Sequence, residues 1–402
     1  MIKGNLVYGQ SGGPSSVINA SAYGVIKEAI KNRDIIEKVF VMKHGISGII
    51  NDDLIDVVEF KDQLEFLKNT PSSAFGSVRY KLPSYLEDPL VYEKMFKTFS
   101  KYNIKYFVYN GGNDSMDTCL KLNEYIKKHN LDIQVIGVPK TVDNDLPHTD
   151  HTPGFGSAAK YIANTMMQIK LDSTVYENGK ITIVEIMGRH AGWLTAASHV
   201  ANLHNLGPDL VYLPEVKIDL NVLVQQVKDV YENSSNCLIA VSEGIKDLDG
   251  NFIGMMNSFK DAFGHNQLGG VAMKLGELLQ EKLGISYRAI ELSSTQRSAA
   301  FIRSESDVLE AEMVGRKAVE FILNGNSGKM VTIKRISNDP YTIQYEAYDV
   351  GEIANLEKVI PGSMINGMEM TQEFFDYILP LIEGEADVVY KHGMQQLFKL
   401  KK

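Results

Sequence analysis

Five short apolar segments constrain the fold of this chain most, because each is followed by a polar loop and then by an amphipathic stretch. The segments are rich in valine, isoleucine and tyrosine, as strands buried in a parallel sheet are. They span residues 5–8, 105–109, 134–138, 181–186 and 238–241. Helix-like stretches cover residues 17–31, 115–128, 157–170 and 194–203. This alternation predicts an α/β fold with mainly parallel sheets flanked by helices.

The composition is that of a globular protein and narrows the class of partner. The chain has 402 residues and a net charge of −9. An acidic surface does not attract nucleic acid or anionic lipid, so we expect neither a nucleic-acid nor a membrane partner. No run of about 18 apolar residues occurs that could span a membrane. Two distant cysteines, Cys119 and Cys237, and no recognisable signal peptide favour a reducing, cytoplasmic location.

The five predicted strand ends carry the chemically informative residues. Each is followed by glycine together with polar or charged side chains, in loops 9–13, 110–114, 139–145, 187–192 and 242–244. Ligands of open α/β sheets bind at the carboxyl ends of the strands. One such loop is ordinary connecting sequence, since Gly, Asn and Asp favour turns. Five together predict a single assembled site.

Two of these loops have the design of an anion cradle. Glycines around Gly12 let backbone N–H groups approach an anion at a helix start, although a tight turn with a serine cap explains the loop equally well. The second loop carries Asp114 beside Asn113. A carboxylate there would repel a phosphate unless a cation lies beside it, and helix capping is the alternative reading.

The third loop, after the strand at 134–138, is the most informative. It places Lys140 close to Asp143 and Asp145. Phosphoryl transfer requires positive charge near the phosphate, a metal ion and an acceptor for the hydroxyl proton. Residues two apart on an extended segment face the same side, so we expect the two carboxylates to converge. The alternative is a solvated acidic loop.

Arginine is scarce in this chain, and its placement is therefore informative. Arg189 lies in the fourth loop, Arg79 follows a glycine-containing stretch, and Arg288 and Arg297 lie further on. Arginine binds phosphate bidentately, whereas Glu243 of the fifth loop suits sugar hydroxyls. Each arginine on its own could equally form a surface ion pair. Together they favour a sugar phosphate as the substrate.

In order and spacing, these loops resemble the phosphofructokinase family from the first strand to about Arg316. The segment 139–145 resembles the catalytic loop of the family. The resemblance implies that Asp143 is the base acting on the 1-hydroxyl of fructose 6-phosphate. It also implies that Asp145 helps to organise Mg²⁺, with Asn113 at a metal-site position that is usually acidic.

The same resemblance assigns the substrate-binding residues. Thr141, with Val142 beside it, and the loop Met187-Gly188-Arg189 would bind the sugar phosphate, and Glu243 would hold its hydroxyls. Four other positions match family residues near the transferred phosphate or the sugar phosphate: Gly12, Arg79, Arg288 and Arg297. Ser294 departs from the pattern, since it stands at a sugar-phosphate position where ATP-dependent relatives have His and many pyrophosphate-dependent ones have Tyr. Lys180 stands where ATP-dependent relatives place an arginine that reaches the sugar phosphate of the neighbouring subunit.

Two departures from the ATP-dependent pattern bear on the phosphoryl donor. Those relatives carry glycine where this chain has Asp114 and Lys140, whereas members with Asp and Lys use inorganic pyrophosphate. Asp114 would occupy the space of a nucleotide α-phosphate and repel it. Lys140 would supply charge to a donor that has no adenosine to anchor it. The resemblance therefore implies reversible transfer from pyrophosphate to fructose 6-phosphate, giving fructose 1,6-bisphosphate and phosphate.

The resemblance also implies a domain organisation and an assembly. We expect two similar lobes with the active site in the cleft between them. Residues 1–155 with about 296–345 would form the donor lobe, 156–295 the sugar-phosphate lobe, and 346–402 an extension packing on both. Neighbouring subunits complete the sugar site in the family, which implies a homodimer or homotetramer.

Three other functions stay open on the sequence. The chain could be an ATP-dependent 6-phosphofructokinase. It could be a non-catalytic, sugar-phosphate-binding regulatory subunit, although binding alone does not require Asp143. It could also act on another sugar phosphate, such as sedoheptulose 7-phosphate.

Overall fold

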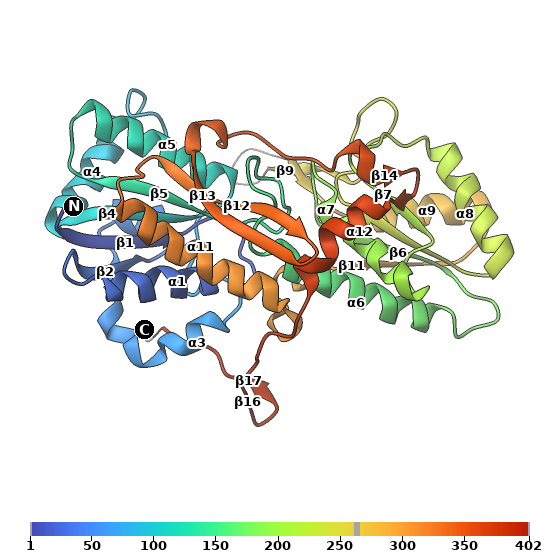
Figure 1. Cartoon of the computed structure of the whole chain (residues 1–402). Helices are drawn as coiled ribbons and strands as arrows, with labels where there is room; N and C mark the ends of the chain where they lie inside the picture. Colours follow the sequence, from blue (N-terminus) through green and yellow to red (C-terminus); the bar gives the residue numbers. More distant parts are fainter. Residues whose placement is uncertain (1, 261–265, 401–402) are drawn as a thin grey trace.

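The computed structural model describes residues 2–260 and 266–400, which form two α/β lobes side by side (Figure 1). The larger lobe has a seven-stranded sheet of order β13-β12-β5-β4-β1-β2-β3. Its central strands are parallel, whereas β3 and β13 are antiparallel edge strands. The strands are β1 (Gly4–Gln10), β2 (Ile36–Met42), β3 (Leu54–Asp56), β4 (Ile104–Gly111), β5 (Gln134–Pro139), β12 (Lys329–Asn338) and β13 (Tyr341–Asp349).

The smaller lobe has a four-stranded, wholly parallel sheet of order β11-β6-β8-β7. Its strands are β6 (Ile181–Ile186), β7 (Leu210–Tyr212), β8 (Cys237–Ser242) and β11 (Tyr287–Glu291). A separate antiparallel pair, β9 (Met255–Lys260) and β10 (Asn266–Leu268), lies between β8 and β11 in sequence. The predicted α/β class with mainly parallel sheets is confirmed.

Helices cover both faces of the larger sheet because its strands are apolar on both sides. Leu6 and Tyr8 face one hydrophobic cluster, whereas Val7 between them faces another. Helices α1 (Ile18–Lys31), α3 (Leu64–Lys68) and α11 (Glu305–Leu323) cover the first face. Helices α2 (Ile46–Ile50), α4 (Pro89–Lys101) and α5 (Asn113–Lys128) cover the second. The smaller lobe repeats this three-layer arrangement.

Helices α1 and α11 pack unusually closely in the larger lobe. A side chain at Gly24 of α1 would place its Cβ 2.0 Å from the carbonyl oxygen of Glu312. A Cβ at Gly315 of α11 would lie 2.1 Å from the carbonyl oxygen of Ser21. Glycine at both positions therefore lets the two backbones touch, which fixes α11 to the first layer of the larger lobe.

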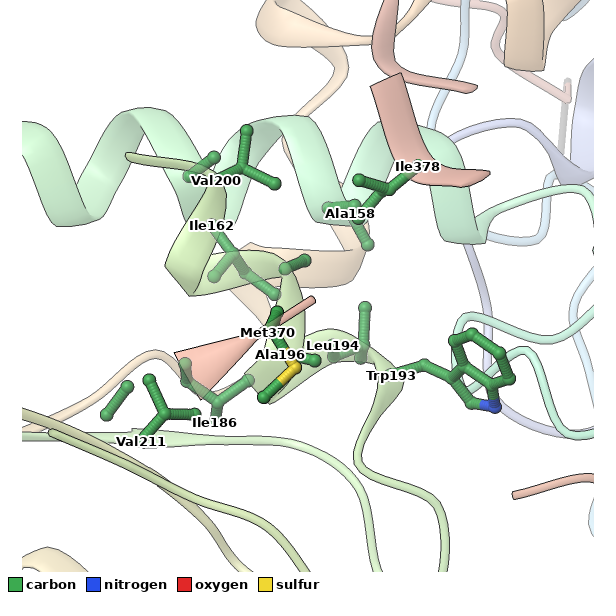
Figure 2. Packing of buried hydrophobic residues seen from close by; sticks show 14 of the residues in the cluster. Ala158, Ile162, Ile186, Trp193, Leu194, Ala196, Val200, Val211, Met370 and Ile378 are labelled. Carbon is green, nitrogen blue, oxygen red and sulfur yellow. The ribbon is translucent and has the colours of Figure 1, made fainter. Parts of the chain in front are cut away.

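In the smaller lobe, α6 (Phe155–Ser173) and α7 (Trp193–Ala197) lie on one face of the sheet and α8 (Leu220–Ser234) and α9 (Val271–Leu283) on the other. The helix predicted over residues 194–203 is an α-helix only as far as Ala197, where α7 ends. The chain then continues as a 3₁₀ helix, Ser198–His204. Figure 2 shows the apolar cluster between α6 and the sheet, which includes Ile162, Ile186, Leu194, Val200 and Ile378.

The segment after β13 packs on both lobes. Phe374 and Ile378 of α12 (Gln372–Ile378) are buried in the cluster of the smaller lobe. Phe398 packs edge-on against Phe60 and Phe75 of the larger lobe. Strand β13 runs to Asp349, beyond the expected boundary near 345. The remaining α-helix is α10 (Thr295–Ser298), and the remaining strands form the short pairs β14 (Ile365–Asn366) with β15 (Glu369–Met370) and β16 (Tyr390–Lys391) with β17 (Met394–Gln395).

Within residues 2–260 and 266–400, we find no helix with the length and apolarity that a membrane crossing requires.

Candidate active site

The loops that follow β1, β4 and β5 of the larger lobe and β6 and β8 of the smaller lobe open onto one cavity of about 680 Å³. Residues of both lobes line it, so it is the cleft between them. The predicted site residues in its wall are Gly12, Arg79, Asn113, Asp114, Lys140, Thr141, Asp143, Asp145, Arg189 and Glu243. The three-dimensional structure thus brings together the five loops that the sequence singled out.

Lys140, directly after β5, is a buried cation at the floor of the cleft. Its Nζ donates a hydrogen bond to the carbonyl oxygen of Gly13, at 2.6 Å. Burial lowers the pKa of Lys140 to about 8, against the opposing effect of the carboxylates of Asp143 and Asp145. Gly12 has φ +75°, a left-handed conformation that brings the first loop towards Lys140. A phosphate bound by this loop would therefore lie beside a lysine.

Asp143 is the carboxylate with the chemistry of a general base. Burial raises its pKa to about 7, and the negative charges of Asp145 and Glu243 act in the same direction, whereas Lys140 opposes them. The hydroxyl of Thr141 accepts a hydrogen bond from the backbone N–H of Asp143, at 3.1 Å. A base with a pKa near neutrality both exists as carboxylate and holds a proton well, which suits it to accept one from a hydroxyl group.

The two carboxylates reach the same cavity by a turn, so the extended segment expected over 143–145 is wrong. Asn144 between them has φ +55°, in the left-handed region. Asparagine tolerates this conformation better than most residues because its short amide hydrogen-bonds locally. Convergence of Asp143 and Asp145 therefore depends on the conformation of one intervening residue and not on strand periodicity.

Asp145 and Asn113 form an oxygen-rich corner that fits a magnesium ion. The Nδ2 atom of Asn113 donates to Oδ2 of Asp145 at 3.4 Å, and the Oδ1 atoms of both residues are buried without a hydrogen-bond partner among the described residues. Burial raises the pKa of Asp145. Mg²⁺ prefers oxygen ligands and keeps waters and substrate phosphates in its shell. The described part of the chain has no cluster of three or more His, Cys, Asp or Glu that could hold a metal.

Arg297 extends from α10 to the first loop of the larger lobe. A Cβ added to Gly13 would lie 3.0 Å from Nη1 of Arg297, which places the guanidinium next to the glycine loop. Burial and the positive charge of Arg79 lower the pKa of Arg297. Two arginines and Lys140 around one loop repel one another, and an anion between them would relieve that repulsion.

The smaller-lobe side of the cleft is built from two interlocked loops. Gly188 has φ +136°, and its N–H donates to Oε1 of Glu243 at 3.3 Å. The N–H of Met187 donates to Oε1 of Gln296 at 3.1 Å, so the residue next to Arg297 positions this loop. Burial raises the pKa of Glu243, and the positive charge of Arg189 acts against this rise. Arg189 and Glu243 thus line the cavity, whereas Met187 and Gly188 supply the N–H groups that hold the two loops in place.

Three residues that the resemblance assigned to the sugar phosphate lie elsewhere in the single chain. Lys180 is exposed just before β6, and Arg288 lies near the amino end of β11, where it pairs with Asp172 at 2.8 Å. Ser294 is exposed before α10. The active-site loops follow the carboxyl ends of the strands, so the first two residues lie at the opposite edge of this sheet. Their role stays a prediction.

Sequence reasoning missed part of the cleft wall. His190 and Lys81 line it, as does the segment formed by Asn355, Leu356 and Glu357. His190 follows Arg189 directly, and that position in a site loop was the signal available. The segment after β13 carried no such signal. It reaches the catalytic loop through the N–H of Lys358, which donates to the carbonyl oxygen of Asp145 at 2.7 Å.

The fold and the cleft define a two-lobed α/β protein with a charged site between its lobes. The family model described as phosphofructokinase matches residues 5–322, and the chain therefore belongs to the phosphofructokinase family.

Individual relatives resemble the chain over its whole length. It is 42% identical to pyrophosphate–fructose 6-phosphate 1-phosphotransferase of Halomonas elongata, over 100% of this chain and 97% of the relative. It is 41% identical to the protein of the same name from Methylococcus capsulatus, over 97% and 94%. The solved structure of pyrophosphate-dependent phosphofructokinase from Nitrosospira multiformis matches with a TM-score of 0.88 at 37% identity, over 100% of this chain and 98% of that one.

Proposed function

We propose that this protein transfers a phosphoryl group from inorganic pyrophosphate to the 1-hydroxyl of fructose 6-phosphate. The products are fructose 1,6-bisphosphate and phosphate, in a reversible step of glycolysis or gluconeogenesis. The observation that carries the proposal is that buried Lys140 and Asp143 line the same interlobe cavity and interact electrostatically. Relatives of 42% and 41% identity bear the name of this activity, which supports the same assignment.

Asp143 takes the proton of the 1-hydroxyl in this mechanism as the oxygen attacks a phosphorus atom of pyrophosphate. A new O–P bond forms, the bridging O–P bond of pyrophosphate breaks, and the leaving phosphate carries away the electron pair. Lys140, Arg79 and Arg297 neutralise the phosphate oxygens, which is the main requirement of phosphoryl transfer. Glu243 and Arg189 hold the sugar phosphate in line.

Magnesium fits the corner formed by Asp145 and Asn113, because both present a buried oxygen atom without a hydrogen-bond partner among the described residues. When bound there, the ion would supply positive charge to the pyrophosphate oxygens and leave coordination sites for water. The protein contribution is to fix Asp145 beside Asp143 on one turn.

Pyrophosphate is preferred to ATP as the donor for a steric and electrostatic reason. Asp114 stands in the first turn of α5, and Asp114 and Lys140 both line the cavity. A nucleotide must place an α-phosphate beyond the two phosphates that react, and a carboxylate at that point repels it. Lys140 meanwhile adds charge that a small, unanchored donor requires.

In this proposal, each lobe binds a different substrate. Residues 1–155 with about 296–345 bind the donor, 156–295 bind the sugar phosphate, and 346–402 pack on both. Association as a homodimer or homotetramer would bring Lys180 and Arg288 of a neighbouring subunit to the sugar phosphate. We place the enzyme in the cytoplasm, where its substrates occur.

Rates measured side by side with pyrophosphate and with ATP test the donor. We expect turnover with pyrophosphate and Mg²⁺ and little or none with ATP. Strong activity with ATP alone would make the protein an ATP-dependent 6-phosphofructokinase. Binding of fructose 6-phosphate without turnover of either donor would indicate a regulatory subunit.

A further inference from the structure

Tyr377 is a buried tyrosine of α12, a helix at the junction of the two lobes (Figure 1). Its ring packs on Trp193 of the smaller lobe, with ring centroids 5.2 Å apart. The guanidinium of Arg335, on β12 of the larger lobe, lies 4.7 Å from the ring centroid. The phenol group therefore has a fixed position between the lobes, and its hydroxyl points to the catalytic loop.

The hydroxyl of Tyr377 forms two hydrogen bonds there. It donates to the carbonyl oxygen of Asp150 at 2.8 Å and accepts one from Nδ2 of Asn144 at 2.7 Å. Asn144 is the fully buried residue that separates Asp143 from Asp145. A residue of the C-terminal extension thus contacts the turn that carries both carboxylates.

The rest of the Asn144 side chain is also held. Its Oδ1 accepts a hydrogen bond from the N–H of Thr152 at 3.1 Å, and the hydroxyl of Thr152 donates to the carbonyl oxygen of Thr141 at 2.8 Å. Asn144 therefore cannot rotate without breaking buried hydrogen bonds at both ends of its amide. Its φ of +55° lies in the left-handed region, which asparagine tolerates better than most residues, and these hydrogen bonds hold the side chain in that turn.

We propose that Tyr377 is a positioning residue whose hydroxyl, through Asn144, holds the left-handed turn that directs Asp143 and Asp145 into the cleft. The inference deepens the proposed phosphoryl transfer and rests on it. Without the hydroxyl, Nδ2 of Asn144 is left buried and unpaired, and the turn relaxes towards conformations that point the carboxylates elsewhere. Glu243 and Arg189 of the other lobe hold the sugar phosphate in the proposed reaction, so the effect belongs in kcat and not in KM for fructose 6-phosphate.

The first test replaces Tyr377→Phe, which keeps the ring packing and removes only the hydroxyl. We expect kcat to fall about tenfold while KM for fructose 6-phosphate stays within about twofold of wild type. The matched control is Tyr212→Phe, since the buried hydroxyl of Tyr212 on β7 bonds Gln226 at 3.0 Å outside the cavity wall. The control should lose similar thermal stability and keep kcat. Unchanged kcat in Tyr377→Phe, or an equal fall in the control, overturns the proposal.

A double-mutant cycle shows whether Tyr377 acts through Asn144. Asn144→Gly keeps the left-handed backbone conformation accessible and removes the amide that bonds the hydroxyl of Tyr377. We expect it to lower kcat at least as much as Tyr377→Phe does. The double variant should then be no slower than Asn144→Gly, because the hydroxyl has lost its partner. Independent, multiplying losses would contradict the mechanism. If Tyr377→Phe does not fold, wild-type kcat in Asn144→Gly overturns the proposal by itself.

Hydrogen exchange separates this inference from the proposed reaction, because it needs no turnover. Amide exchange in residues 141–146, followed by mass spectrometry on the full chain, should be faster in Tyr377→Phe than in wild type or Tyr212→Phe. Faster exchange in Tyr377→Phe, in a protein that turns over neither pyrophosphate nor ATP, would support the positioning role of Tyr377 and reject the proposed reaction. Unchanged exchange in Tyr377→Phe, in a protein that is active with pyrophosphate, would reject the positioning role of Tyr377 and support the proposed reaction.

Discussion

The two sides of the cleft are built differently, although both come from α/β lobes. On the larger-lobe side, Lys140 and Asp143 are ionisable groups that burial moves towards neutrality, with pKa values of about 8 and about 7. On the smaller-lobe side, Arg189 and Glu243 extend from loops locked by Gly188 and Gln296. In the proposed reaction, the larger-lobe side accepts the proton and the smaller-lobe side recognises the sugar phosphate. Chemistry and recognition can then be altered separately.

The C-terminal extension joins the two sides. Lys358 bonds the carbonyl oxygen of Asp145 through its N–H, and its own carbonyl oxygen accepts a hydrogen bond from Nε1 of Trp193 at 3.2 Å. Glu357 lies 3.7 Å from Nδ1 of His190. A segment without recognisable chemistry in its sequence therefore links loop 140–145 of the larger lobe to the loop that follows β6 in the smaller lobe.

The largest expected effect comes from the proton acceptor on the larger-lobe side. Asp143→Asn should lower kcat by about 10²–10⁴-fold, because an amide cannot accept the hydroxyl proton. KM for both substrates should change little, as measured by steady-state kinetics. Asp132→Asn is a suitable control, since Asp132 is an exposed carboxylate paired only loosely with Lys105 at 3.6 Å. Near-wild-type kcat in Asp143→Asn would remove Asp143 from this role.

The donor-determining pair should give the next largest effect. The double change Asp114→Gly with Lys140→Gly removes both the carboxylate that repels a nucleotide and the cation that holds pyrophosphate. We expect kcat/KM for pyrophosphate to fall about 10²-fold or more, with no parallel fall for ATP. Measuring both donors on one preparation is the check. An equal fall for both would mean that the two residues support the fold and not donor choice.

A change on the smaller-lobe side should affect recognition alone. Glu243→Gln keeps an oxygen for the N–H of Gly188 but weakens hydrogen bonds to sugar hydroxyls. We expect KM for fructose 6-phosphate to rise about tenfold, with KM for pyrophosphate unchanged. Varying each substrate in turn separates the two constants. A comparable rise in KM for pyrophosphate would erase the distinction between the two sides.

The smallest effect is a shift in pH dependence set by Lys140. Its pKa of about 8 means that the ammonium loses its proton as pH rises through that value, and kcat/KM for pyrophosphate should fall there. Lys140→Arg keeps the positive charge at higher pH, so the alkaline fall should move upward even if the overall rate is lower. The pH profiles of the two proteins provide the comparison. Coincident alkaline limbs would show that another group titrates.

Much of this architecture can be predicted from short segments of the sequence. Buried strands of Val, Ile and Tyr are apolar on both faces wherever they occur, so β1, β4, β5, β6 and β8 were predictable from composition and length alone. Because the carboxyl ends of parallel strands share one edge, the same pattern placed Asp143, Lys140, Arg189 and Glu243 near a common site. Those inferences use only neighbours in sequence and a general rule of sheet geometry.

Tertiary structure decided what depends on distant contacts. Asn144 adopts its left-handed turn beside Tyr377, which lies 233 residues further along the chain. Asn355 and Glu357 line the cleft because the extension crosses from one lobe to the other, and Lys180 and Arg288 lie away from it because they belong to the amino-end half of their sheet. The residue types of the site follow from the sequence. The orientation of its carboxylates depends on tertiary packing. Hydrogen bonds between segments far apart in sequence select one backbone conformation among several that the loop permits.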